Sequence, residues 1–373
     1  MWKRVCYDEM RTARTNNTPH GRFENRRGGV TMDKLILVDG NSIANRAFFA
    51  LPLLSNASGL YTNAVYGFTT MLIKLLEEER PTHFLVAFDA GKATFRHKDY
   101  EDYKGGRAKT PPELSEQFPL IKQLLDAFGI SQFELEGYEA DDIIGTLSRV
   151  ADERGVETLI VTGDKDLLQL ASERVTVALT RKGISEVERY TPDAIRERYG
   201  LTPRQIIDLK GLMGDASDNI PGVPGVGEKT ALKLLHQYGT VENVIAHADE
   251  LAGKMKEKIT EHADSARLSK QLAAIFREVP MDIDWDRLRY GGYDPQALSA
   301  MFRKLEFKSL LDKLALPSGE KTGETVERIE VFIAEGERLD ELIDKLSAVE
   351  AVHIEVIGDN PHMADVIGLS FFA

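Results

Sequence analysis

The sequence predicts an α/β fold in which a parallel, doubly wound sheet is followed by a helical region and then by an incomplete α/β unit. Three apolar runs bounded by turn residues indicate buried strands, at Leu35–Val38, Phe84–Phe88 and Thr158–Val161. Stretches with helical spacing of apolar residues separate them, at Val65–Glu79 and Glu116–Phe128. Strands that alternate with helices favour a parallel sheet, and such sheets bind ligands beyond the carboxyl ends of their strands.

A further helix is predicted over Ile143–Arg154, because the preceding Glu-Ala-Asp-Asp places carboxylates in a first helical turn. We therefore take residues 32–190 as the core. From residue 191 to 315 short helices replace the strands, at Pro192–Tyr199, Pro203–Met213, Lys229–Tyr238 and Leu251–Ala263. A polar stretch with Pro and Gly, residues 316–325, is typical of a linker. Beyond it, residues 326–373 predict a strand, a helix and two strands, at Val326–Ile333, Arg338–Leu346, Val352–Ile357 and Val366–Phe372.

The composition is that of an ordinary globular protein, with 42% hydrophobic and 29% charged residues in a chain of 373. Cys6 is the single cysteine, so a disulfide framework and a zinc cluster are excluded and a reducing cytosol fits. No apolar run approaches the roughly 18 residues of a membrane span. Residues 1–31 carry six arginines without a hydrophobic segment, and we interpret them as a disordered leader rather than a secretory signal. The net charge of −13 argues against a nucleic-acid partner unless the acids hold cations.

Carboxylates follow the predicted strands where those strands end. Asp39 closes the first strand, Asp89 follows the second, and Asp164 and Asp166 follow the third. Other acids open a helix or lie three residues apart on one helical turn; they are Glu139, Asp141, Asp142, Asp215 and Asp218. A single aspartate after a strand is usually a turn residue or a helix cap, so each one alone carries little weight.

Several converging carboxylates have a different meaning, because packing them together is costly unless cations compensate. Oxygen ligands without His or Cys select Mg²⁺ or Mn²⁺ rather than zinc. Two such ions about 4 Å apart are the arrangement that hydrolyses phosphodiesters. A kinase or GTPase would need a Gly-rich phosphate loop with its lysine, and the sequence has none.

The motifs that carry these acids resemble those of the 5′ nuclease (flap endonuclease-like, PIN-related) domain of bacterial DNA polymerase I. They are Leu-Val-Asp-Gly-Asn-Ser, Ala-Phe-Asp-Ala, Gly-Tyr-Glu-Ala-Asp-Asp, Thr-Gly-Asp-Lys-Asp and Gly-Asp-Ala-Ser-Asp-Asn-Ile-Pro-Gly, in the expected order between about Met32 and Ala315. The resemblance implies a 5′–3′ exonuclease and flap endonuclease with two metal ions. It assigns Asp39, Asp89, Glu139, Asp141 and Asp142 to the first metal site. It assigns Asp164, Asp166, Asp215 and Asp218 to the second.

Two elements are suited to binding DNA. Residues 222–231 look like the hairpin of a helix-hairpin-helix, where Gly222, Gly225 and Gly227 let backbone N–H groups approach a phosphate beside Lys229 and Thr230. The alternative is a Gly-Pro turn. By analogy with the family, this hairpin also holds a monovalent cation such as K⁺.

The second element is a basic and aromatic stretch that begins at residue 92, where a channel for single strands and a solvated charged loop are both open interpretations. The resemblance identifies residues 92–119 as the arch, with Arg96, Lys104 and Arg107 on basic positions and Lys104 assisting catalysis. Arg46 follows Asp39 by two helical turns, so it either faces the scissile phosphate or lies on the surface.

The last segment resembles the start of the degenerate, RNase H-like 3′–5′ exonuclease domain of Bacillus-type enzymes. His353, Ile354 and Glu355 stand where proofreading versions carry Asp-x-Glu, so no proofreading is expected. We interpret the chain as a truncated or split product, with a polymerase domain on a separate chain as one option. The resemblance implies a monomer in the bacterial cytoplasm, working at the nucleoid on DNA with 5′ flaps, nicks or RNA primers. A DNA-binding protein with little catalysis and a PIN-type ribonuclease are the alternatives.

Overall fold

The computed structural model describes residues 33–91, 94–181, 186–282, 284–317, 353–357 and 368–372. The chain divides into two compact units, Met1–Gly319 and Glu320–Ala373. Within the described ranges, no helix is both long and apolar enough to cross a membrane. The predicted leader, and most of the predicted linker and last segment, lie outside the described residues.

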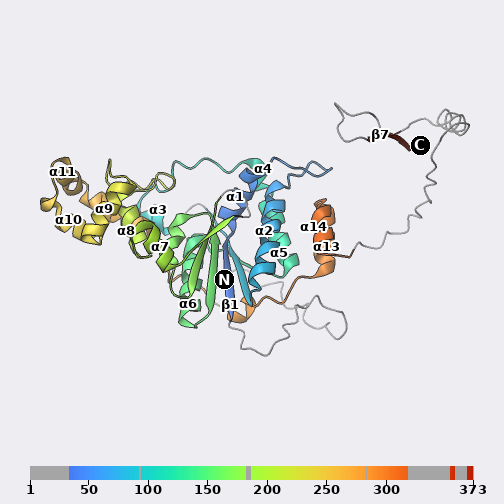
Figure 1. The fold of residues 1–373 in the computed structure, drawn as a ribbon, viewed down its shortest axis with the longest axis horizontal. Helices are drawn as coiled ribbons and strands as arrows, with labels where there is room; N and C mark the ends of the chain where they lie inside the picture. Colours follow the sequence, from blue (N-terminus) through green and yellow to red (C-terminus); the bar gives the residue numbers. More distant parts are fainter. Residues whose placement is uncertain are drawn as a thin grey trace, which may run out of the picture. The chain divides into compact units, whose positions relative to one another are not determined.

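The first unit is built on a six-stranded sheet in the order β3-β2-β1-β4-β5-β6 (Figure 1). The strands are β1 (Lys34–Asp39), β2 (His83–Ala87), β3 (Ser131–Phe133), β4 (Glu157–Thr162), β5 (Val175–Thr180) and β6 (Val187–Tyr190). All neighbouring strands are parallel except β5 and β6, which are antiparallel. The α/β class is thus confirmed. The sheet is larger than the three predicted strands because β3 and β5 extend it in parallel and β6 adds an antiparallel edge.

Side chains of the central strands alternate between two buried layers. Leu35 and Leu37 of β1 face one layer, and Ile36 and Val38 face the other; all four are fully buried. Burial on both faces explains why these strands read as continuous apolar runs rather than alternating ones. Each buried Leu, Ile or Val side chain stabilises the fold by about 1.5–3 kcal/mol relative to exposure.

Helices cover both faces of the sheet. One layer contains α1 (Gly40–Ala50), α2 (Asn63–Glu79), α5 (Phe118–Phe128), α13 (Pro295–Lys304) and α14 (Lys308–Lys313). The other contains α6 (Ala140–Glu153), with η1 (Lys165–Leu170). Two short helices, α3 (Phe95–Asp99) and α4 (Pro112–Ser115), bound the chain segment that passes over the carboxyl edge of the sheet (Figure 1). A 3-10 turn, η3 (Trp285–Leu288), precedes α13.

Between β6 and η3 the unit contains helices alone, gathered at one end of the sheet (Figure 1). They are α7 (Pro192–Tyr199), α8 (Gln205–Met213), α9 (Glu228–Tyr238), α10 (Val241–Ala246), η2 (Ala248–Glu250), α11 (Lys254–Glu261) and α12 (Ala263–Ala273). The helix predicted over 251–263 corresponds to α11, with both ends shorter than predicted. The sequence analysis missed α12, which begins after the helix breaks at His262. In the second unit, β7 (His353–Ile357) and β8 (Gly368–Phe372) form an antiparallel pair. They correspond to the two strands predicted over 352–357 and 366–372.

Candidate active site

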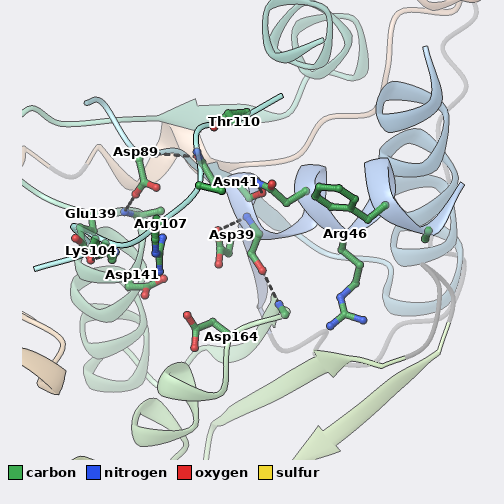
Figure 2. Close-up of a pocket in the computed structure, with 17 residues that line it drawn as sticks. Asp39, Asn41, Arg46, Asp89, Lys104, Arg107, Thr110, Glu139, Asp141 and Asp164 are labelled. Atoms are coloured by element: carbon green, nitrogen blue, oxygen red, sulfur yellow. Dashed lines mark hydrogen bonds and ion pairs between the residues drawn. The ribbon is translucent and has the colours of Figure 1, made fainter. Parts of the chain in front are cut away.

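A cavity of about 640 Å³ opens at the carboxyl edge of the sheet, and five acids line it (Figure 2). They come from four places in the fold: the end of β1, the loop after β2, the start of α6 and the loop after β4. Parallel pairing of β1 with both β2 and β4 brings these strand ends together. The acids are Asp39, Asp89, Glu139, Asp141 and Asp164. The structure thus unites five of the nine predicted ligands around one space.

Asp39 is held rigidly where β1 becomes α1. Its carboxylate accepts hydrogen bonds from Ser42 N at 3.0 Å and from Thr162 Oγ1 at 2.9 Å, and only 4% of the residue is exposed. Burial, with the nearby charges of Asp89 and Asp164, raises the pKa of Asp39 to about 7 against the pull of these hydrogen bonds. A carboxyl group held in this way is ready to bind a cation, because a cation restores its charged form.

Asp89 and Asp141 lie across the cavity from Asp39. Asp89 Oδ1 accepts a hydrogen bond from Ala140 N at 2.9 Å, which joins the loop after β2 to the start of α6. Burial raises the pKa of Asp89. Burial, followed by the charges of Asp39 and Asp164, raises the pKa of Asp141 well above its usual range. Mutual repulsion among these acids therefore favours a bound cation.

Asp164 leads from the cavity to a second group of acids. Its side chain accepts from Asp166 N at 2.8 Å, so Asp164 caps η1. Burial raises the pKa of Asp164, and the charges of Asp218 and Asp215 add to the effect. Burial likewise raises the pKa of Asp166 to about 7, again with Asp164 contributing.

The second group comprises Asp166, Asp215 and Asp218, none of which lines the cavity. Lys210 of α8 lies between the first two, with its Nζ 2.7 Å from Asp166 Oδ1 and in contact with Asp215 Oδ2. Burial alone would raise the pKa of Asp215, but hydrogen bonds from Lys210 and Ser217 outweigh it and hold this pKa below its usual value. The sequence analysis missed Lys210, although it lies five residues before Asp215 and on the same segment.

Cations from the arch approach the acids from the other side. Lys104 Nζ lies 2.8 Å from Glu139 Oε2 and 3.8 Å from Asp218 Oδ2, and Arg107 pairs with Asp218. Tyr103 is only 3% exposed, and its hydroxyl lies 3.3 Å from both Glu139 Oε2 and Asp218 Oδ2. Tyr103 is thus part of this charged network, although the pattern of basic and aromatic residues had suggested stacking on bases.

As the side chains stand, no three acids or histidines in the described ranges are arranged to hold one ion. Lys104 and Lys210 instead approach the carboxylates of the two groups and balance part of their charge. The donor set nevertheless fits divalent ions, since it consists of carboxylate oxygens and contains neither His nor Cys. Burial raises the pKa of five of these acids, as described above.

Besides the second group of acids, two further predicted residues, Asp142 and Arg96, do not line the cavity. Asp142 is fully buried and pairs with Arg96, which is 3% exposed. Arg46, in contrast, lines the cavity from α1 (Figure 2). Its Nη1 donates to the carbonyl of Arg181. Polar and aromatic lining residues that the sequence analysis did not single out are Asn41, Ser42, Asn45, Phe49 and Thr110.

The three glycines of the predicted hairpin differ in their roles. Gly222 has φ of +60°, and a Cβ there would lie 2.3 Å from Gly214 N, so close backbone packing requires glycine. Gly225 has φ of +76° and faces the Lys258 ammonium group. Gly227 caps α9 with ordinary extended backbone and open space around it. Lys229 is exposed and Thr230 half-buried in the first turn of α9.

Comparison with known proteins agrees with this geometry. Two family models match consecutive segments: the 5′-3′ exonuclease N-terminal resolvase-like domain over residues 34–200, and the 5′-3′ exonuclease C-terminal SAM fold over residues 201–296. DNA polymerase I of Bacillus caldotenax is 55% identical over 338 residues, and that of Streptococcus pneumoniae R6 is 47% identical over 349. These matches cover 90% and 91% of this chain but 38% of each relative, so the chain spans well under half of their length.

Solved structures share the fold at low sequence identity. T5 5′-exonuclease with bound zinc superposes with a TM-score of 0.53 at 22% identity, covering 76% of this chain and 99% of that one. The catalytic core of Rad2 in complex with DNA substrate gives 0.54 at 17% identity, covering 77% and 93%. At such identities the likeness establishes a common architecture.

Proposed function

The chain belongs to the 5′-3′ exonuclease family, and from that premise we propose that it hydrolyses DNA phosphodiesters at 5′ ends and at single-strand to double-strand junctions. The observation that carries the proposal is the cavity at the carboxyl edge of the sheet. It combines five acids with the cationic side chains of Arg46, Lys104 and Arg107. Acids that hold metal ions, beside cations that attract phosphate, suit phosphodiester hydrolysis.

We assign the metal ions to the acids of both groups. Asp39, Asp89, Glu139 and Asp141 would hold one Mg²⁺ or Mn²⁺, and Asp164, Asp166, Asp215 and Asp218 would hold the second. The chemistry that such ions supply is a water of lowered pKa and compensation of the charge on the phosphate. The hydrogen bonds from Ser42 and Thr162 keep Asp39 oriented for this task.

Cationic side chains would bind and orient the DNA. Lys104 and Arg107 reach the acids from the arch, and Arg46 reaches the cavity from α1, so a phosphate placed there meets positive charge from two directions. The exposed part of the hairpin, Gly225–Gly227, would contact duplex backbone through its N–H groups and the start of α9, without reading sequence. Gly222 is excluded from this contact, because it is buried and its N–H donates to Ser269 Oγ at 2.8 Å. A monovalent cation such as K⁺ at this hairpin is part of the same proposal.

The biological setting is proposed by likeness to the DNA polymerase I relatives, of which this chain spans 38%. We place the protein in the cytoplasm, as a monomer acting at the nucleoid on flaps, nicks and RNA primers during primer removal and repair. A polymerase activity, if it accompanies this nuclease, would come from a separate polypeptide or domain.

Cleavage of a labelled 5′-flap duplex, with Mg²⁺ and with EDTA, tests the proposal. The wild-type protein should cut at the flap junction only with Mg²⁺. Asp164→Asn with Asp166→Asn should abolish cutting but retain junction binding, whereas the control Asp249→Asn, at an exposed ion pair, should behave as wild type. Tight binding by the wild type without cutting would indicate a DNA-binding protein, and cutting of single-stranded RNA alone would indicate a PIN-type ribonuclease.

A further inference from the structure

Asp142 was predicted to be a metal ligand, but its carboxylate is already saturated with hydrogen bonds. Oδ1 accepts from Arg96 Nη2 at 2.7 Å and from Phe276 N at 2.9 Å. Oδ2 accepts from Arg96 Nη1 at 2.8 Å and from Glu139 N at 3.1 Å. A carboxylate has about four acceptor positions, and these four donors fill them. The residue is fully buried, so no oxygen of Asp142 is free to face an ion in the cavity.

Arg96 is held just as completely. Besides its two-pronged pairing with Asp142, its Nε donates to the carbonyl of Leu272 at 3.1 Å and its Nη2 to the carbonyl of Ala274 at 2.9 Å. Its guanidinium group also lies over the ring of Phe95, 4.6 Å from the ring centre. With 3% of the residue exposed, Arg96 has no surface with which to contact a DNA phosphate.

The pair joins three segments that are far apart in sequence. Arg96 belongs to α3, the foot of the arch that carries Lys104. Asp142 belongs to the first turn of α6, which carries Glu139 and Asp141. Leu272–Phe276 is the end of α12 and the residues after it, and so belongs to the helical region that carries the hairpin. Tyr103 and Lys104 of the arch also contact both Glu139 and Asp218, so the pair is one of several contacts that join these three parts.

We propose that Asp142 is a positioning residue rather than a metal ligand, and that its buried pair with Arg96 fixes the arch and the helical region to the helix that presents Glu139 and Asp141. This inference rests on the proposed nuclease function and refines its site. A planar guanidinium with a two-pronged carboxylate contact fixes orientation as well as distance, which a lysine in place of Arg96 cannot do. Loss of either member would displace Lys104 relative to Glu139, and so would impair turnover without removing an ion ligand.

Calorimetric titration with Mn²⁺, in parallel with flap-cleavage kinetics, separates the two roles. Asp142→Asn and Arg96→Gln should each bind Mn²⁺ with wild-type stoichiometry, whereas Asp141→Asn should lose an ion. Both should lower kcat by about ten- to hundredfold, the usual effect of losing a partner behind a metal site. Arg96→Gln also loses the bonds to the carbonyls of Leu272 and Ala274. The double variant should therefore have about the kcat of Arg96→Gln alone, because the Asp142 substitution removes a pairing that is already lost. Asp193→Asn, in an exposed pair of α7, is the isosteric control and should change neither readout.

The inference would be overturned if Asp142→Asn bound one Mn²⁺ fewer than wild type. It would also be overturned if kcat of the double variant fell by the product of the two single reductions. If Asp142→Asn does not fold, Arg96→Lys takes its place: it keeps the charge, and should bind Mn²⁺ normally while turnover falls. A wild-type protein that binds Mn²⁺ but cuts no flap would refute the proposed function, and the Mn²⁺ comparison would still decide the role of Asp142. A wild-type protein that binds no Mn²⁺ would overturn both.

Discussion

Lys210→Met should destabilise the protein in the absence of divalent ions, and added Mg²⁺ should restore much of the loss. The Lys210 ammonium group serves two carboxylates, Asp166 and Asp215, and the three side chains are 11–14% exposed. Removing one partner of a buried ion pair costs about 3–5 kcal/mol. Since these groups retain some contact with water, we expect about 3 kcal/mol, the lower end of that range.

For a domain of this size, such a loss corresponds to a decrease in Tm of about 6–12 °C, at roughly 2–4 °C per kcal/mol. Thermal unfolding followed by circular dichroism in EDTA measures it. The control is Lys313→Met, which breaks a surface pair with Glu77 whose side chains are 44% and 47% exposed. Such pairs contribute about 0–1 kcal/mol, so this variant should unfold close to wild type.

The same melts in Mg²⁺ test the link to the proposed metal site. If ions bind Asp166 and Asp215, they supply the charge that Lys210 supplied, so Mg²⁺ should raise the Tm of Lys210→Met more than that of wild type. A Lys210→Met protein that unfolds with the control in EDTA would refute the assigned role of Lys210. If Mg²⁺ raised the Tm of wild type and of Lys210→Met equally, the idea that Mg²⁺ and Lys210 neutralise the same acids would be refuted.

Three further predictions concern the hairpin and the pH dependence of stability. Gly225→Ala should weaken duplex binding in a fluorescence anisotropy titration, because φ of +76° strains alanine. The control Gly291→Ala, outside the hairpin and with open space around it, should bind as wild type, and equal behaviour of the two variants would contradict the hairpin geometry. Burial alone would raise the pKa of Glu79, but hydrogen bonds from Lys34 and Arg189 outweigh it and hold this pKa below its usual value. The stability that Glu79 contributes is therefore present above about pH 4.3, and it is lost as the pH falls through the pKa of the folded state. Glu79→Gln should therefore flatten the acid limb of urea-unfolding free energies, and an unchanged limb would rule this contribution out. Burial lowers the pKa of His83, so on acidification this histidine is protonated in the unfolded chain before it is protonated in the folded one. The free energy of unfolding should therefore decrease as the pH falls below about 6.5. His83→Leu should remove this slope in the same titration, and a slope that persists in the variant would have to come from other groups.

The part of the fold that sequence predicts well is the part with the strongest physical pattern. β1, β2 and β4 are central strands buried on both faces, so their apolar runs are unambiguous. β3 has three residues, all half-buried, and lacks a comparable run. β6, at the antiparallel edge, has only its last residue, Tyr190, buried, so it too lacks an apolar run. The break between α11 and α12 has neither Gly nor Pro to mark it, since it falls at His262.

Within the site, backbone placement follows from sequence but side-chain partners do not. Parallel topology alone brings Asp39, Asp89 and Asp164 to one edge. In contrast, Asp142 follows Asp141 directly, yet one faces the cavity and the other turns into the core to meet Phe276 N, 134 residues away. Such a contact depends on how the helical region packs against α6, and no local pattern encodes it.

The negative net charge, which argued against DNA, is explained by where cations lie rather than by how many there are. Lys104 has φ of +56°, a left-handed conformation that is costly for a residue other than glycine. It is held there because Lys104 N donates to the carbonyl of Asp218 at 2.9 Å and Asn219 Nδ2 donates to the carbonyl of Asp102 at 2.8 Å. The loop that carries Asp218 thus fixes the turn of the arch, and the strained backbone directs the Lys104 ammonium group toward Glu139. Strain of this kind persists where surrounding contacts over-determine it, typically at functional sites, so the position of Lys104 is a built feature of the proposed site.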